Sequence, residues 1–169
     1  MNMKIDSRER LVRDIADAMQ NFTKEFDNRW FVNVTEQEVS IRVDPDYCDH
    51  DCLWPNNGDE VVEIDPIPSH EAFKAMEAFA DEQPRPIAEK LYRALSGSRP
   101  FARFKAAADV LDLLQDWYDY QNKWYIEKAE EWMRENGVDF EDGKVVCTGS
   151  TMTWLEESED EEDEEQDDY

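Results

Sequence analysis

The stretch RWFVNVTEQEVSIRV, residues 29–43, decides the fold class, because its apolar residues abandon the helical spacing that precedes them. Two runs within it, 29–34 and 39–43, are rich in aromatic and β-branched residues and flank the polar segment TEQE. This pattern is typical of a β-hairpin. A third run of the same kind, VVEID (61–65), is closed by Pro66. We therefore predict a small antiparallel sheet.

Most of the other apolar residues recur every three or four positions, which predicts helices before and after these strands. Asp6 with Glu9 is the expected capping box of the first helix, and Ser69 is the expected N-cap of the second. Four of the expected helices span residues 7–26, 70–82, 99–108 and 109–136, and Gly137 ends the last of them. The fifth lies between residues 82 and 99, where Pro84 opens it and Gly97 ends it. Residues 144–155 predict one or two further strands.

The sequence thus predicts an α+β fold, in which an N-terminal helix and a small antiparallel sheet pack with a bundle of about four further helices. Residues 1–155 are expected to form a single domain. The last segment, EESEDEEDEEQDDY (156–169), holds eleven acidic residues and no basic one. Because like charges repel and apolar groups are nearly absent, we expect it to be a disordered acidic tail.

Net charge is the most pronounced feature of the composition, since 43 acidic residues stand against 18 basic ones, for a formal charge of −25. Proteins bind nucleic acid and anionic membranes mainly through Lys and Arg side chains. The excess of acidic residues in this chain therefore argues against both ligands. A basic protein surface is the expected partner, although high charge also serves solubility alone. No apolar run approaches the length of a membrane helix.

The N-terminal segment MNMKIDSRER is charged and lacks the apolar core of a signal peptide. The three cysteines are an odd number, which fits a reducing compartment better than a disulfide scaffold. Both features favour a cytoplasmic location.

Three segments follow the order and pattern of a known family: DPIPSHEAFKAMEAFA (65–80), LYRALSGSRPFARFK (91–105) and WYDYQNKWYIEKAEEWMRENG (117–137). In them the chain resembles the bacterial uncharacterised protein family 0158, well over residues 60–137 and loosely over 8–45. The residues that carry the resemblance are Ser69, Glu71, Ala72, Met76, Leu95, Gly97, Phe101, Arg103, Phe104, Trp117, Tyr118, Trp132 and Gly137. The resemblance implies an α+β fold, and because the family has no established activity it supplies no catalytic residues.

Basic residues are concentrated in residues 85–105, which contain six of them and a single acidic residue. On a helix through the second half of this stretch, Arg99 and Arg103 share one face. Phe101 and Phe104 fall on the opposite face. We therefore predict that the phenylalanines are core anchors and that the arginines form an exposed cationic patch near the start of the helix.

The predicted anion-binding site consists of Arg99, Arg103 and Arg93, because guanidinium groups near a helix N-terminus suit a phosphate or carboxylate. The favoured alternative is that these arginines form ordinary salt bridges with the many Asp and Glu residues. A related hypothesis is that the acidic tail, which spans up to about 45–50 Å when extended, reaches the patch and masks it.

Aromatic residues are concentrated on the predicted helix 109–136. Aromatic side chains at helical spacing usually lie in the core, and this is the favoured interpretation. They cover a wide arc of the helix, however, so the alternative is a partner-binding face formed by Trp117, Tyr120 and Trp124.

A metal site is conceivable at DYCDHDC (46–52), where Cys48, His50 and Cys52 are ligand types that zinc accepts. Their spacing departs from that of structural zinc sites, which favours a polar loop without a metal. If this chain binds a metal, its expected ligands are Cys48, His50 and Cys52.

Catalytic and cofactor motifs are absent from the sequence, which holds no P-loop and no dinucleotide-binding glycine pattern. Ser69, His70 and Glu71 are consecutive, so on a helix they point in different directions and cannot form a relay. We therefore predict no catalytic residues and no cofactor.

Two functions remain open. The first is a non-enzymatic acidic interaction protein that engages a basic protein partner, including as a nucleic-acid mimic. The second is an anion- or nucleotide-binding domain, with or without enzymatic activity, that uses Arg99 and Arg103.

Overall fold

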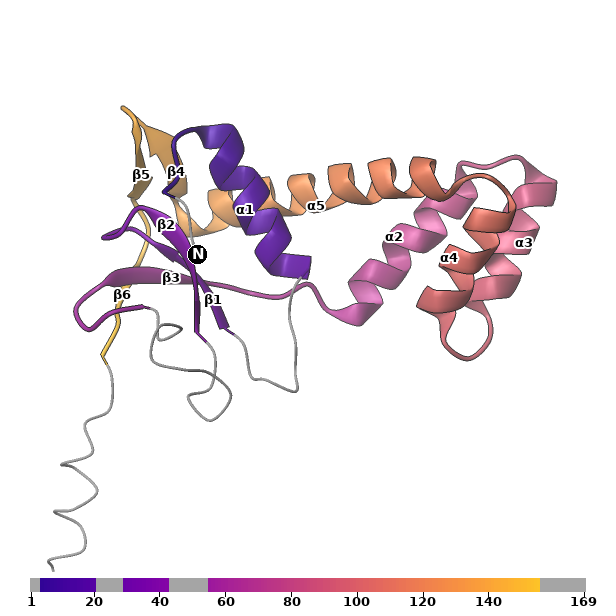
Figure 1. Cartoon of the computed structure of the whole chain (residues 1–169), viewed down its shortest axis with the longest axis horizontal. Helices are drawn as coiled ribbons and strands as arrows, with labels where there is room; N and C mark the ends of the chain where they lie inside the picture. Colours follow the sequence, from indigo (N-terminus) through magenta and orange to yellow (C-terminus); the bar gives the residue numbers. More distant parts are fainter. Residues whose placement is uncertain (1–3, 21–28, 43–54, 156–169) are drawn as a thin grey trace, which may run out of the picture.

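The computed structural model describes residues 4–20, 29–42 and 55–155 and confirms the α+β fold (Figure 1). The helices in these ranges are α1 (Arg8–Gln20), α2 (Ser69–Asp81), α3 (Arg85–Leu95), α4 (Pro100–Val110) and α5 (Leu114–Asn136). The strands are β1 (Arg29–Asn33), β2 (Glu38–Arg42), β3 (Glu60–Ile64), β4 (Val138–Glu141), β5 (Lys144–Cys147) and β6 (Met152–Thr153). Residues 21–26, predicted as the end of the first helix, lie outside the described residues.

The main sheet has the strand order β2-β1-β3-β6, and all of its neighbouring strands are antiparallel. β1 and β2 form the predicted hairpin, in which Phe31 lies opposite Ser40. Alternation places Val32 of β1 on the face covered by α1, whereas Phe31 contacts Trp154 on the other face at a ring-centroid distance of 5.2 Å. The strands predicted at 29–34, 39–43 and 61–65 are therefore confirmed to within one or two residues.

A second hairpin, β4–β5, was not predicted in full. Gly137 ends α5 in the left-handed conformation, with φ of 68°, as its position in the sequence predicts. The chain then enters β4 directly, and Asp142 and Gly143, at φ of 53° and 78°, turn it into β5. Consecutive residues with positive φ suit a tight two-residue hairpin, so the dipeptide Asp-Gly was the signal that the prediction missed.

Two predicted helix caps are wrong, each for a local reason. α1 begins after Ser7, whose Oγ accepts a hydrogen bond from the backbone N–H of Arg10 at 3.1 Å, so Ser7 takes the place assigned to Asp6. α2 begins at Ser69 itself, after Pro68, and no side chain caps it. The predicted cap was therefore one residue early in α1 and one residue late in α2.

The predicted boundary between the last two helices, at 108/109, is also misplaced. α4 continues to Val110, and Asp112 then adopts a left-handed φ of 59° that breaks the helical path. The N–H of Leu113 donates to the carbonyl of Ala108 at 2.7 Å, and α5 starts at the next residue.

Two hydrophobic clusters are joined by α5, which runs along the length of the molecule (Figure 1). One cluster, in what we call the sheet lobe, combines α1, the sheet, β4–β5 and the second half of α5. The other, in the helical lobe, combines α2, α3, α4 and the first half of α5. Trp124 of α5 packs against both clusters. A helix of 23 residues spans about 35 Å, so α5 both separates and connects the lobes.

Candidate functional site

Five of the six basic residues of 85–105 lie on α3 and α4, which pack side by side in the helical lobe (Figure 1). The connection between these helices ends at Arg99, whose φ of 52° and ψ of 53° lie in the left-handed region. Pro100 then begins α4, because its fixed φ suits the first position of a helix. The sharp turn places the basic residues of the two helices next to each other.

The predicted segregation of aromatic and basic side chains is confirmed on α4. Phe104 is fully buried, and its ring contacts those of Trp117 and Phe79 at centroid distances of 5.0 and 6.2 Å. Phe101 is half-buried against the same cluster. Arg103, one residue before Phe104, is exposed. The helix is therefore anchored by its phenylalanines and presents its cations to solvent.

A groove of about 290 Å³ lies between the two helices, and we call it the basic groove. Lys90 and Arg93 line it from α3, and Arg103 lines it from α4. Its remaining walls are formed by three alanines, Ala94, Ala106 and Ala107. Because alanine side chains are short, a ligand in the groove can approach the three cations closely. Arg99, which was predicted to share the site, is exposed but does not line the groove.

Five of the six cations of this region lack carboxylate partners in the described part of the chain; the exception is Arg85, whose Nε lies 3.6 Å from a carboxylate oxygen of Glu89. Among the described residues, none of the following has a carboxylate oxygen within 4 Å: Lys90, Arg93, Arg99, Arg103 and Lys105. Elsewhere some cations are paired, as between Arg29 and Glu63 at 2.7 Å and between Arg8 and Asp139 at 3.1 Å. Others, such as Lys123 and Lys144, also have no carboxylate oxygen within 4 Å among the described residues. The expectation that these arginines form ordinary salt bridges is therefore wrong for the described part of the chain.

Lys90 is the groove residue that the sequence analysis did not single out. The available signal was its spacing from Arg93, since residues three apart share a helix face. Two like charges at this spacing repel each other, at a cost of a few tenths of a kcal/mol. Both cations therefore lie on one face of α3, and neither has a carboxylate oxygen within 4 Å among the described residues.

Comparison with known proteins connects this architecture to a family. Residues 8–146, from the start of α1 into β5, match the model of the "Uncharacterised protein family (UPF0158)". The chain belongs to this family. The match confirms the resemblance seen over residues 60–137 and 8–45 and extends it through the intervening segment.

One curated relative of this UPF0158 member is UPF0158 protein PA5073 of Pseudomonas aeruginosa, which is 34% identical over 90 residues. The aligned stretch covers 52% of this chain and 59% of the relative, so the chain spans less than two thirds of the relative's length. No solved structure matches the chain. The family description assigns no activity, and function must be argued from the geometry.

The three aromatic residues predicted to form a partner-binding face differ in exposure. Trp117 is 1% exposed, and its ring stacks on that of Tyr120 at a centroid distance of 6.1 Å. Tyr120 and Trp124 are half-buried. Burial raises the pKa of the Tyr120 hydroxyl, and the carboxylates of Glu82 and Glu127 raise it further. Partner binding by this face remains a prediction, and in this structure its surface is formed by Tyr120 and Trp124.

The remaining candidates contribute little to a site. Cys48, His50 and Cys52 lie outside the described residues, and within these no cluster of His, Cys, Asp and Glu is suited to a metal ion. The imidazole of His70 is 71% exposed, with Nε2 3.7 Å from a carboxylate oxygen of Glu71. In the part of the chain that the structure describes, no helix combines the length and apolar character needed to cross a bilayer.

The tail hypothesis meets a constraint from the shape of the molecule, although residues 156–169 themselves lie outside the described ranges. β6, which precedes the tail, is at the opposite end of the long axis from α3 and α4 (Figure 1). α5 alone accounts for about 35 Å of that separation. A fourteen-residue tail, which spans at most about 45–50 Å, would have to run along the length of α5 to reach the basic groove.

Proposed function

We propose that this protein is a binding module that recognises an anionic group of its partner through the basic groove. The observation that supports the proposal is the convergence of Lys90, Arg93 and Arg103 on one cavity, where none of them pairs with a described carboxylate. Each cation at about 4 Å from an anion contributes about 1 kcal/mol even at the dielectric constant of water. Three together contribute about 3 kcal/mol, which supports weak, salt-sensitive binding of the anionic group.

The charge of the rest of the chain limits the size of that anion. Residues 85–110 hold six basic and two acidic residues, which leaves 12 basic and 41 acidic residues elsewhere. Charges beyond about 8 Å are largely screened at physiological ionic strength, so a compact anion in the groove responds mainly to the groove cations. A long polyanion such as DNA or RNA extends over the acidic remainder and is repelled. A phosphate group or a short cluster of carboxylates fits the groove better.

The test is a titration of the full chain with inorganic pyrophosphate at physiological ionic strength, followed by NMR spectroscopy or thermal shift. Arg103→Gln and Lys90→Gln should each weaken binding about tenfold, the effect of losing one charge-assisted hydrogen bond. Lys123→Gln makes the same change of charge at an exposed position of α5 outside the groove, and it should leave the affinity nearly unchanged. Equal effects at all three positions would show a non-specific response to net charge.

A second candidate function, the binding of a basic partner, is favoured by the surroundings of Tyr120. The carboxylates of Glu82, Glu127 and Asp81 all raise the pKa of its hydroxyl, so negative charge lies near this half-buried aromatic ring. Such a combination suits the guanidinium or ammonium groups of a basic peptide, which pair with carboxylates and pack on aromatic rings. We infer that this acidic face is the part of the surface that contacts a basic protein.

An arginine-rich peptide added at low salt tests the second candidate. The double variant Glu82→Gln with Glu127→Gln should weaken its binding more than Glu135→Gln with Glu141→Gln, two exposed positions outside this face. Binding that responds equally to both pairs would reflect the charge of the whole molecule and would count against a defined acidic face.

A further inference from the structure

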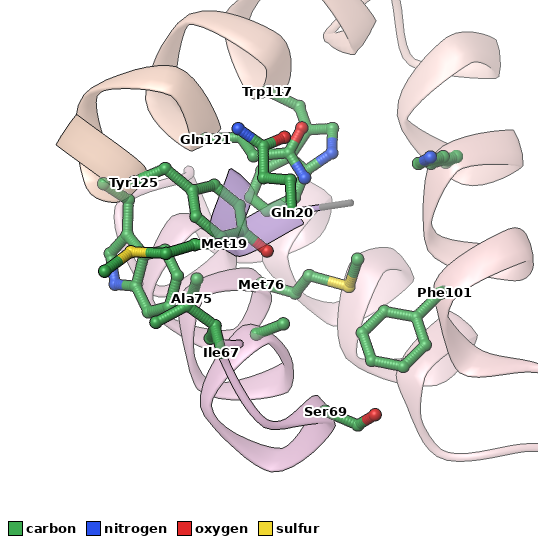
Figure 2. Close-up of a pocket in the computed structure, with 13 residues that line it drawn as sticks. Met19, Gln20, Ile67, Ser69, Ala75, Met76, Phe101, Trp117, Gln121 and Tyr125 are labelled. Atoms are coloured by element: carbon green, nitrogen blue, oxygen red, sulfur yellow. The ribbon is translucent and has the colours of Figure 1, made fainter. Parts of the chain in front are cut away.

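A second cavity, of about 310 Å³, lies where the two lobes meet and is distinct from the basic groove. Four helices contribute to its lining. Figure 2 shows Met19 of α1, Met76 of α2, Phe101 of α4 and Trp117 of α5 arranged around it. Aromatic rings and methionine thioethers form surfaces on which a planar apolar molecule packs well. We call this space the junction cavity.

The charge of the junction cavity is the reverse of that of the chain. None of its 13 lining residues is acidic, in a protein with 43 acidic residues. Its one charged lining residue is Lys105, which has no carboxylate oxygen within 4 Å among the described residues. The cavity is therefore complementary to a molecule that carries a negative charge.

Two further polar features lie at the same place. Trp117 lines the cavity, is 1% exposed, and its indole Nε1 has no hydrogen-bond partner in the described structure. A buried donor without an acceptor is costly, but this nitrogen has almost no exposed area, so a ligand in the cavity packs on the ring of Trp117 and does not bond to its nitrogen. Ser69 also lines the cavity and begins α2, whose N-terminus has no side-chain cap. The carboxylate of Glu71 already stands in the first turn of α2, so the positive end of this helix is not a separate site for a ligand.

We propose that the junction cavity binds a small aromatic carboxylate. Its ring packs among Met76, Phe101 and Trp117, and its carboxylate is held by the ammonium group of Lys105. A volume of about 310 Å³ equals that of about ten water molecules, which limits the ligand to about ten non-hydrogen atoms. The site does not depend on the basic groove, since Lys105 and Arg103 line different cavities.

The probe is phenylacetate, which meets this limit of size, and phenylacetamide is its neutral counterpart of the same shape. The full-length protein is labelled with ¹⁵N, and the indole N–H resonances of its six tryptophans are followed by NMR during each titration. The resonance of Trp117 is assigned by its loss in Trp117→Phe. We expect phenylacetate to shift this resonance in a saturable manner, with an affinity about tenfold higher than that of phenylacetamide.

Two pairs of variants locate the site. Lys105→Gln should weaken phenylacetate binding about tenfold, whereas Lys123→Gln, a lysine outside the cavity, should not. Ala72→Leu places extra atoms in the cavity from α2 and should abolish binding, whereas Ala78→Leu, at a similarly half-buried position of α2 outside the cavity, should not.

The proposal is overturned by any of three results: no shift of the Trp117 resonance at about 10 mM phenylacetate, equal affinities for phenylacetate and phenylacetamide, or unchanged binding in Ala72→Leu. The remaining indole resonances show whether each variant is folded. If Ala72→Leu does not fold, the comparison of the acid with its amide and the Lys105→Gln variant still decide the matter.

Discussion

The guanidinium group of Arg103 lies against the backbone of Gly97, in the space that a Cβ atom would occupy at that position. A side chain at Gly97 would overlap the Nη1 atom of Arg103. Gly97 does not adopt a left-handed φ, so what the fold needs here is the absence of a side chain and not unusual backbone freedom. The turn between α3 and α4 thus holds a cation of the basic groove in place.

Gly97→Ala should therefore displace the guanidinium group of Arg103 without changing any charge. The affinity for pyrophosphate should fall about threefold, because a cation moved away from its position forms a weaker ion pair with the ligand. Global stability should change little, since the clash falls on the flexible end of an exposed side chain. The measurement is the same NMR titration, with Ser98→Ala as the control in the same turn.

The outcome separates two claims. If Arg103→Gln weakens binding but Gly97→Ala does not, Gly97 has no positioning role and the proposed function stands. If neither variant weakens binding, the basic groove is not the anion site.

Arg99 occupies a strained conformation that glycine would adopt more easily. A non-glycine residue in the left-handed region costs about 1–2 kcal/mol, and glycine loses about 0.5–1 kcal/mol through the entropy of the unfolded chain. Arg99→Gly should therefore raise the free energy of unfolding by about 0.5–1 kcal/mol. Urea denaturation measures this change, and Ser98→Gly, where φ is not positive, should instead lower the stability.

The same variant tests whether Arg99 belongs to the anion site. Because Arg99 does not line the basic groove, its loss should weaken pyrophosphate binding less than Arg103→Gln does. An equal loss of affinity would show that Arg99 belongs to the anion site, as the sequence predicts.

Phe104 and Phe101 should differ sharply in their contributions to stability. Phe104 is 0% exposed and contacts the rings of Phe79 and Trp117, so Phe104→Ala should cost about 3–5 kcal/mol. Phe101 is half-buried beside the junction cavity, and Phe101→Ala should cost less than half as much. Thermal or urea unfolding gives both values. Equal losses would contradict the assignment of Phe104 as the main anchor of α4.

Local patterns explain which parts of the fold could be predicted. The hairpin of β1 and β2 follows from alternating β-branched and aromatic residues, and the burial of Phe104 beside an exposed Arg103 follows from the helical period. Both depend only on residues close in the sequence. β5 lies within the predicted strand segment 144–155, whereas β4 escaped prediction because it is only four residues long and begins directly at the end of α5.

The sites were less predictable, because each depends on how helices pack. The basic groove combines Lys90 and Arg93 of α3 with Arg103 of α4, and no spacing along a single helix contains this set. Arg99 satisfied the helical spacing but lies before α4, in a turn whose backbone departs from the helix. The junction cavity draws on four helices, so its lack of acidic residues is visible only after folding.

Glu38 on β2 provides a pH-dependent prediction. Its side chain is buried at 7% exposure, and burial raises the pKa of its carboxyl above the ordinary 4.5. The charges of Glu36 and Asp59 raise this pKa further, whereas the ammonium group of Lys4 lowers it. The folded state therefore binds this proton more tightly than the unfolded state does. The contribution of Glu38 to stability is complete below pH 4.5 and is lost as the pH rises through the raised pKa.

Glu38→Gln keeps the shape of the protonated side chain and removes its titration. The variant should be more stable than the wild-type protein at neutral pH, and this advantage should vanish below pH 4.5, where Glu38 itself is protonated in both states. Urea denaturation over this pH range measures the difference. Glu141→Gln, at an exposed position of β4, should show no such trend. If the free energy of unfolding of the variant instead exceeded that of the wild type more and more towards acid pH, the prediction would be wrong. That result would show that the folded state stabilises the charged form of the Glu38 carboxyl.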